Sequence, residues 1–288
     1  MPVIENTAEK IIARLREQEN EEGGLPLLLE FYRGLLEVQA KARKRIGVLS
    51  PTISGAGVQS RLDRGQPLAG FDELVIDWPL LRETFIRTIA MFGKYPQLFG
   101  ELPKNLCVPD AGSFLTKKTM KAWYHNNVLP AAILNGGNAN LVGMILQSAM
   151  QPLLSTHAGA LKGQVKQEFW HRGYCPICGG VPDFAYLEKE AGARWLVCSR
   201  CDFEWQFPRL ECPYCRTTDQ ASLSFFTDES EIYRLYLCDQ CRCYLKTIDL
   251  RRTDADILLP LERIYTVDID RQAVERGYSP GRFSNKKN

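Results

Sequence analysis

The chain has 288 residues, enough for one or two domains with a sizeable apolar core. Its 36 Lys and Arg residues against 34 Asp and Glu residues give a formal net charge of +2, which argues against a dedicated nucleic-acid-binding protein with a basic surface. Hydrophobic residues make up 45% and charged residues 24%, so the composition excludes disordered and fibrous chains and is typical of a globular protein.

The N-terminal sequence MPVIENTAEK lacks the apolar segment of a signal peptide. No stretch approaches the ~18–20 apolar residues of a membrane span. We therefore expect a cytoplasmic protein with no membrane insertion. In that reducing compartment, ten cysteines favour metal sites over disulfides.

Helical patterns dominate the first part of the chain. Residues 7–22 and 26–46 are predicted helices, the second with one continuous apolar stripe. Residues 47–70 are rich in glycine and include two prolines, which predicts a loop. Asp77 is the predicted N-cap of a helix that ends near Phe92.

Further helices are expected before the character of the chain changes. One follows Ser113, and residues 139–150 are apolar nearly all round, which predicts a buried helix. Pro152 is expected to start the next helix, which runs to about Trp170.

From Gly173 onward, short β-type runs alternate with pairs of cysteines. One short helix is expected near residues 269–276. The predicted strands cover residues 181–187, 193–198, 203–207, 223–227, 233–238 and 244–250.

These patterns predict an α+β protein in which helices come first and two small β modules of the zinc-ribbon type follow in tandem. The expected domains are an α-helical domain over 1–170, a first module over 171–210, a second module over 211–252 and a C-terminal tail over 253–288.

The cysteines of the two modules form four C-x-x-C pairs. The gap is 19 residues between the first two pairs and 22 between the last two, and each half opens with Cys-Pro-x-Cys, so one unit is duplicated. A C-x-x-C turn lets two sulfurs approach one ion, and two such turns joined by a hairpin complete a tetrahedron. We predict two four-cysteine metal sites, made of Cys175, Cys178, Cys198 and Cys201 and of Cys212, Cys215, Cys238 and Cys241.

Each site is predicted to hold one metal ion. Tetrahedral sulfur sites suit zinc and also mononuclear iron of the rubredoxin kind, and the sequence leaves both open. The alternative is a set of redox or disulfide cysteines. A redox C-x-x-C normally occurs singly beside a βαβ pattern, which the sequence does not predict here.

Two cysteines remain outside the pairs. Cys243 is interpreted as a small buried hydrophobe because the first module has the apolar Phe203 at the equivalent place. A spare ligand or a reactive thiol is the alternative for Cys243. Cys107, in the segment LCVPD, is interpreted as an inert cysteine.

The sequence shows no catalytic motif outside these thiols, and its three histidines are scattered. Residues 170–252 contain 11 Lys and Arg and 12 Asp and Glu. Each four-cysteine site with a divalent ion adds a charge of about −2, so the modules are acidic and unsuited to binding phosphates.

Several motifs in the second part of the chain are more specific than cysteine pairs alone. The main motifs are Trp170-x-x-Gly173-x-Cys175-Pro-x-Cys178-Gly179, Cys198-x-x-Cys201 with Trp205, Arg209-Leu-x-Cys212-Pro-x-Cys215, and Cys238-x-x-Cys241-x-x-Tyr244-Leu245-Lys246. With these motifs the chain resembles the formate dehydrogenase accessory (formation) protein family. A weaker match to the same family lies at Asp268-Ile-Asp270 and Gly277-Tyr278.

The resemblance implies a cytoplasmic maturation factor that is not an enzyme. Such proteins are needed for active respiratory formate dehydrogenase and contact its catalytic subunit before export. The resemblance also implies a rubredoxin-like fold around each four-cysteine site, with iron as a candidate ion. Cys243 departs from the family motif, which usually has a small residue other than cysteine there.

Two other functions stay open at this point. A rubredoxin-like electron-transfer protein would use iron at one or both sites. A zinc-ribbon nucleic-acid-binding protein is the third reading, and the acidic charge of the modules opposes it.

Overall fold

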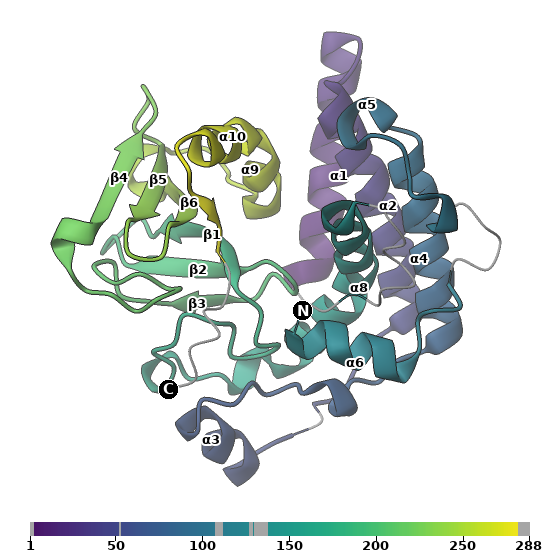
Figure 1. Ribbon diagram of the computed structural model, residues 1–288, viewed down its shortest axis with the longest axis horizontal. Coiled ribbons are helices and arrows are strands. Elements are labelled where there is room, and N and C mark those ends of the chain that lie inside the picture. Colours follow the sequence, from purple (N-terminus) through teal and green to yellow (C-terminus); the bar gives the residue numbers. More distant parts are fainter. Residues whose placement is uncertain (1–2, 52, 107–111, 127–128, 130–137, 282–288) are drawn as a thin grey trace. The chain divides into compact units, whose positions relative to one another are not determined.

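The computed structural model describes residues 3–51, 53–106, 112–126, 129 and 138–281 (Figure 1). The chain divides into two compact units. The helical unit comprises residues 1–52 and 69–160, and the cysteine unit comprises residues 53–68 and 161–288. An N-terminal helical region followed by a sheet that carries the cysteines confirms the predicted α+β class.

The expected ranges 1–170, 171–210, 211–252 and 253–288 stay predictions for the domain boundaries. The structure adds that residues 53–68, far from the cysteines in sequence, belong to the cysteine unit. Within that unit Leu68 donates its N–H to the carbonyl of Pro176 at 2.8 Å, and the Tyr174 hydroxyl donates to the carbonyl of Gly65 at 2.7 Å. These bonds join the early segment to the first cysteine turn.

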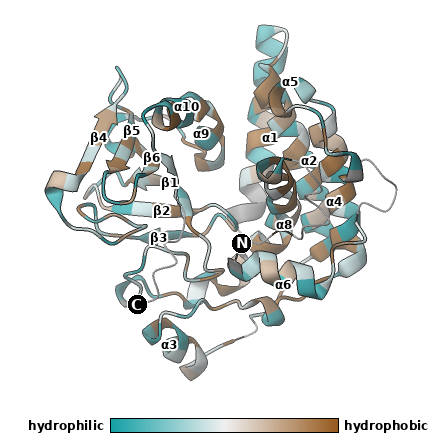
Figure 2. Cartoon of the chain, in the orientation of Figure 1, coloured by the Kyte–Doolittle hydropathy of each residue, from teal (hydrophilic) through white to brown (hydrophobic). Residues whose placement is uncertain are grey.

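The helical unit is built around an apolar core between its longest helices. Phe31 and Phe92 stack edge to face with ring centroids 4.9 Å apart, and the apolar face of α4 is visible as brown ribbon in Figure 2. Asp77 caps α4 as predicted, accepting from the N–H of Leu80 at 3.0 Å. The helices are α1 (Val3–Glu22), α2 (Leu27–Ile46), α4 (Trp78–Gly93), α5 (Pro96–Phe99), α6 (Lys117–Asn126) and α8 (Ala139–Leu161).

Two expectations about helices are wrong. Pro152 does not start a helix, because it lies inside α8. Proline lacks the N–H that would bond the carbonyl four residues earlier, that of Ser148. The Gln39 side-chain amide donates to this carbonyl at 2.9 Å and so lets the helix continue. In the segment 47–70, the structure contains the short helix α3 (Ala56–Asp63) where a loop was expected.

The cysteine unit contains one mixed sheet in the order β3-β2-β1-β6-β5-β4. β7 (Ser279–Pro280) pairs with β6 outside this path. All six expected strands are confirmed to within one residue at each end: β1 (Pro182–Leu187), β2 (Arg194–Cys198), β3 (Glu204–Gln206), β4 (Leu223–Thr227), β5 (Tyr233–Cys238) and β6 (Cys243–Asp249).

The sheet reproduces the duplication seen in the sequence. β1, β2 and β3 form one antiparallel set and β4, β5 and β6 form the other, each set alternating with its own cysteine pairs. The two sets join through a parallel pairing of β1 with β6, from Phe184 opposite Lys246 to Leu187 opposite Asp249. The two modules therefore share a continuous sheet.

The C-terminal segment covers part of this sheet with two short helices, α9 (Leu259–Tyr265) and α10 (Val267–Glu275). Ala273 of α10 packs with Leu235, Leu237 and Tyr244 in one buried cluster. The expected short helix near 269–276 is thus α10, and α9 precedes it. No helix among the described residues is both long and apolar enough to cross a bilayer.

Candidate metal centres

All four cysteine pairs adopt one local turn. In each, the residue after the second cysteine donates its N–H to the carbonyl of the first cysteine, at 2.8–3.2 Å. That residue has a left-handed backbone every time. The four residues and their φ angles are Gly179 (71°), Asp202 (57°), Arg216 (67°) and Arg242 (56°).

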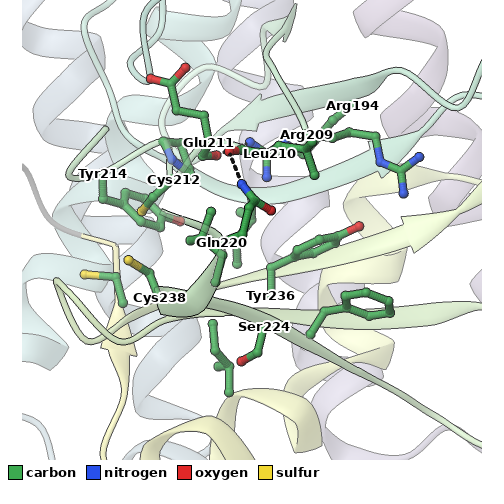
Figure 3. A pocket seen from close by; sticks show the side chains of 16 residues that line it. Arg194, Arg209, Leu210, Glu211, Cys212, Tyr214, Gln220, Ser224, Tyr236 and Cys238 are labelled. Atoms are coloured by element: carbon green, nitrogen blue, oxygen red, sulfur yellow. Dashed lines mark hydrogen bonds between the residues drawn. The ribbon is translucent and has the colours of Figure 1, made fainter. Parts of the chain in front are cut away.

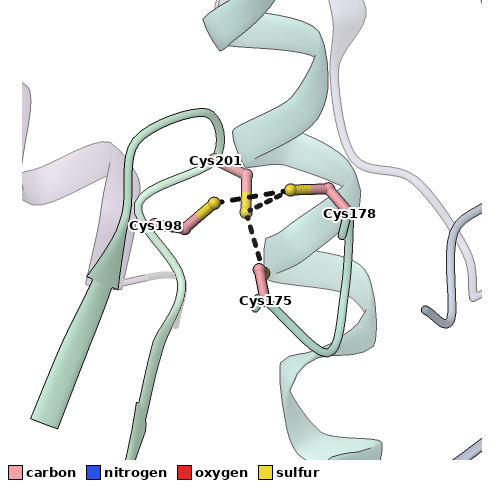
Figure 4. Close-up of side chains that lie close together, drawn as sticks. All are labelled: Cys175, Cys178, Cys198 and Cys201. Carbon is pink, nitrogen blue, oxygen red and sulfur yellow. Dashed lines mark hydrogen bonds between the residues drawn. The ribbon is translucent and has the colours of Figure 1, made fainter. Parts of the chain in front are cut away.

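The first cluster brings together Cys175, Cys178, Cys198 and Cys201, whose sulfurs converge on one centre (Figure 4). The Sγ–Sγ distances are 3.4 Å between Cys178 and Cys198 and 3.6 Å between Cys175 and Cys201. All four side chains are buried. The sulfurs of Cys175, Cys178 and Cys198 each accept a hydrogen bond at 3.4 Å. In each case the donor is the backbone N–H of the residue two positions later in the sequence.

The second cluster brings together Cys212, Cys215, Cys238 and Cys241. Its Sγ–Sγ distances are 3.7 Å between Cys212 and Cys241 and 3.6 Å between Cys215 and Cys238. Cys215 and Cys241 are only partly buried, whereas every cysteine of the first cluster is buried. The second cluster is therefore the more accessible of the two.

These distances fit tetrahedral metal sites. A metal–sulfur bond of about 2.3 Å in a regular tetrahedron separates the sulfurs by about 3.8 Å. A disulfide would require about 2.05 Å, and these thiols are free. Both sets are the ones predicted from the spacing, although their role as ligands stays a prediction. The donor set suits soft, tetrahedral ions such as zinc or iron.

The thiols of each cluster differ in acidity. Hydrogen bonds from Cys241, assisted by backbone N–H groups, lower the pKa of Cys212 to about 5. Burial raises the pKa of Cys238 to about 12. In the first cluster, hydrogen bonds from Cys175 and Cys198 hold the pKa of Cys178 well below its usual value. Four thiolates this close together would repel one another, so a bound cation would be needed to keep them all ionised.

Cys243 lies beside the second cluster without belonging to it. It is buried, and its thiol donates to the carbonyl of Cys241 at 3.6 Å. It stands opposite Cys238 in the pairing of β5 with β6. This placement agrees with a small buried side chain. Cys107 lies outside the described residues.

The glycine that follows the first turn explains how closely the first cluster is packed. A Cβ atom on Gly180 would lie 2.8 Å from the Cys198 sulfur and 3.2 Å from the Cys178 sulfur. No side chain fits there without moving a sulfur. The sequence motif ends at Gly179, and nothing in the sequence alone indicates that Gly180 packs against the sulfurs.

The Trp170 and Gly173 motif residues anchor the segment that leads into the first turn. The Trp170 indole is fully buried and donates to the carbonyl of Tyr174 at 2.8 Å. A Cβ atom on Gly173 would lie 1.7 Å from the carbonyl oxygen of Pro213, in the first turn of the second cluster. Gly173 therefore lets the two modules approach each other at this point.

The Tyr-Leu-Lys motif serves the contact between β6 and α10. The buried Lys246 ammonium donates to Asp270 at 2.7 Å and to the carbonyl of Arg263 at 3.0 Å. The Tyr244 hydroxyl donates to the other carboxylate oxygen of Asp270 at 2.8 Å. Asp270, found in the weak tail motif, is thus the acceptor for both residues of the stronger motif.

The aromatic residues of the modules lie in packing positions. The Trp205 ring is fully buried, with its indole N–H donating to the carbonyl of Arg172 at 2.9 Å. Tyr186 and Trp195 stack across β1 and β2. These rings are held by the sheet, which agrees with a packing role in preference to base stacking.

Comparison with known proteins agrees with this architecture. The model of the FdhE central domain matches residues 174–209, the first module. An FdhE homologue of Aquifex aeolicus is 28% identical over 261 residues, which cover 87% of this chain and 85% of that protein. An FdhE homologue of Stutzerimonas stutzeri is 31% identical over 108 residues, or 36% of this chain and 35% of that protein.

A solved structure shares the fold. The crystal structure of the FdhE protein from Pseudomonas aeruginosa superimposes with a TM-score of 0.58 at 20% identity, covering 97% of this chain and 94% of that one. At this level of identity the likeness shows that the two proteins share the fold. The chain is therefore similar to FdhE proteins over most of its length, in agreement with the resemblance of its cysteine motifs.

Proposed function

We propose that this protein is a cytoplasmic accessory factor for the assembly of an active respiratory formate dehydrogenase, and that it binds the catalytic subunit of that enzyme before export. The observation that carries the proposal is the pair of four-cysteine clusters in a chain that is similar to FdhE proteins over most of its length. In this role the protein recognises its client and has no catalytic activity of its own.

We further propose that the eight paired cysteines bind two metal ions, iron or zinc, one in each cluster. The sulfur spacing and the N–H groups that point at the sulfurs support this assignment. A bound ion supplies the positive charge that four close thiolates need. The protein's own residues fix the turns, bury the sulfurs and hold the two modules in one sheet. The modules can then present surface loops of fixed shape to a client at low entropic cost.

The role is tested by measuring formate-dependent dye reduction in cells that lack this protein. We expect the catalytic polypeptide to be made but to remain inactive, and a plasmid copy of the gene to restore activity. A tagged copy should co-purify with the immature catalytic subunit and bind the finished enzyme poorly. Full formate oxidation without the protein would rule out the proposed role.

The metal assignment is tested separately by elemental analysis of anaerobically purified protein. We expect about two equivalents of iron plus zinc in each chain. Cys178→Ala and Cys215→Ala should each lose about one equivalent, whereas the control Cys243→Ala should keep both. Loss of an ion from the Cys243 variant would make Cys243 a ligand.

A further inference from the structure

Strands β1 and β4 occupy equivalent places in the two duplicated modules, but in the described part of the chain β1 has a partner strand on both edges and β4 has one partner. β1 follows the first cysteine pair of the first module, and β4 follows the first pair of the second module. β1 pairs with β2 on one side and in parallel with β6 on the other. Among the described strands, β4 pairs only with β5. The other edge of β4 is equivalent to the edge of β1 that pairs with β6, and it is open in the described structure.

The open strand is apolar and exposed. Phe225 and Phe226 are 49% and 50% exposed, although the strand belongs to a sheet whose other strands are mostly buried. Natural proteins usually protect such an edge with lysine, proline or a covering loop. β4, with the sequence LSFFT, has neither of these residues. At the other edge of the sheet, β3 is three residues long, and the Gln167 side chain accepts the N–H of Gln206 at 3.0 Å.

The backbone of β4 is ready to pair. Ser222 accepts from Asp239, and Asp228 donates to Tyr233, so even-numbered residues bond to β5. In an antiparallel pair, alternate residues of a strand hydrogen-bond to the partner strand. The backbone N–H and C=O groups of Phe225 and Thr227 therefore point away from β5, toward the open edge. An extended segment placed along β4 would meet these groups as β6 meets β1.

A cavity of about 170 Å³ lies beside the open strand, large enough for one aromatic or branched aliphatic side chain (Figure 3). Its walls include Leu223 and Phe225 of β4, Tyr236 of β5 and Leu210 of the segment before the second cluster. Leu210 is itself 67% exposed. Cys212, Cys238 and Cys243 also line this space, so the cavity adjoins the second cluster.

Two of the residues that line the cavity, Arg194 and Tyr236, have a buried polar atom without a hydrogen-bond partner in the part of the chain that the structure describes. Arg194 is buried, and its guanidinium donates to the carbonyls of Pro208 and Glu211. Its Nε and the Tyr236 hydroxyl have no hydrogen-bond partner among the described residues. No carboxylate of the described part of the chain pairs with Arg194 or with Arg209 at the rim. A buried cation without a counter-ion is costly, and an incoming carboxylate would provide one.

We propose that β4 and this cavity form a docking site for an extended segment of the client polypeptide. The segment adds a strand to β4, places one large apolar side chain in the cavity and directs a carboxylate toward Arg194 and Arg209. Added strands gain affinity from main-chain hydrogen bonds and specificity from side-chain pockets. This inference rests on the proposed function for the identity of the client, and it adds where the client binds.

The test uses a substitution that blocks strand addition and little else. The N–H of Thr227 points away from β5, so Thr227→Pro removes an outward donor and leaves the bonds to β5 in place. Thr227→Val changes the same side chain and keeps the N–H. The probes are the immature catalytic subunit and an array of overlapping synthetic peptides that spans its sequence.

We expect the full-length protein to bind a peptide that combines a large apolar residue with a nearby Asp or Glu. Thr227→Pro should weaken this binding at least about tenfold, and Thr227→Val should leave it nearly unchanged. Arg209→Glu should also weaken peptide binding, whereas Arg209→Lys should keep most of it. Hydrogen exchange should show new protection at the amides of Phe225 and Thr227 when the peptide is bound.

Three outcomes would contradict the docking site. Equal capture of the subunit by the wild type and by Thr227→Pro would overturn it and leave the proposed function standing. A dimer of the free protein that Thr227→Pro splits would show that a second copy covers β4. Absence of subunit binding by the wild type, together with full formate oxidation in cells lacking it, would remove the proposed function as well.

Discussion

Gln39 shows how one side chain can keep a helix intact across a proline. Its amide reaches from α2 to the Ser148 carbonyl of α8, where Pro152 offers no N–H. The Gln39 side chain is itself buried, so water cannot replace this bond. The position of a proline can be read from the sequence, but a remote glutamine that compensates for it cannot.

Gln39→Leu should therefore destabilise the helical unit by about 1–3 kcal/mol, because it leaves a buried carbonyl without a donor. Chemical denaturation followed by circular dichroism measures this change. Pro152→Ala restores an N–H at the right place, so the double variant should lose much less than the Gln39 variant alone. Additive effects of the two substitutions would show that the two residues act independently.

His157 links the stability of the helical unit to pH. The ring is buried, and its Nε2 accepts the N–H of Val75 at 3.2 Å, which requires the neutral form of the imidazole. Desolvation lowers the pKa of His157 in the folded protein. The unfolded chain, with an ordinary value of about 6.5, then binds the proton more readily than the folded chain does.

We expect this unit to lose stability as the pH falls below about 6.5, by at most about 1.4 kcal/mol per pH unit from this residue, until the folded-state pKa is passed. His157→Gln can accept the same N–H and cannot be protonated, so it should flatten this part of the pH dependence. Thermal unfolding at several pH values provides the measurement, with the exposed His125→Gln as the control substitution. An unchanged slope in the His157 variant would exclude the linkage.

The repeated cysteine turn is the element that shapes both clusters. Each turn requires a left-handed residue after its second cysteine, and the sequence offers glycine only at Gly179. Asp202, Arg216 and Arg242 adopt the same conformation without being glycine. Their side chains have partners, as when Arg263 pairs with Asp202 and Arg216 pairs with Glu211. Side-chain contacts of this kind offset a backbone strain of about 1–2 kcal/mol at each turn.

Gly180→Ala should damage the first cluster selectively. The added methyl would meet two sulfurs of that cluster and none of the second, so we expect loss of about one of two metal equivalents. Gly163→Ala is the matched control, because a Cβ atom there meets nothing within 4 Å. Elemental analysis of both variants decides the matter, and equal loss from both clusters would contradict the local explanation.

The strands and the two cysteine sets could be predicted from the sequence because each signal is local. β-type runs lie between C-x-x-C pairs, and a hairpin brings two pairs together. The parallel pairing of β1 with β6 could not be predicted in this way, since it joins Phe184 to Lys246 and depends on the edges that the two modules leave free. Asp270 was visible only as part of a weak motif, and its bonds to Lys246 and Tyr244 arise from the packing of α10.

At the scale of the whole molecule, residues 53–68 belong to a different unit from the residues on either side of them in the sequence. They lie between segments of the helical unit in sequence, but they belong to the cysteine unit. Composition could not reveal this, because a glycine-rich segment looks the same whichever unit it contacts. The contacts of Leu68 and Gly65 reach Pro176 and Tyr174, at the first cysteine turn.

A fragment of residues 161–288 should therefore fold poorly around its first cluster. It keeps all eight paired cysteines but lacks the donor for Pro176 and the acceptor for Tyr174. We expect a chelator to remove metal from its first cluster much faster than in the full chain, while the second cluster behaves similarly in both. Equal rates for the first cluster would show that residues 53–68 do not support it.

The tandem order of the modules has a consequence in time. Cys241 leaves the ribosome about 40 residues after Cys201, which at about 5–20 residues per second is a delay of about 2–8 s. Residues 53–68 are already available when the first turn emerges, whereas β1 must wait for β6 before its second edge is covered. If both clusters bind metal as proposed, the first can be filled while the second is still being synthesised. When metal is scarce in the cell, newly made chains would then carry an occupied first cluster and an empty second one.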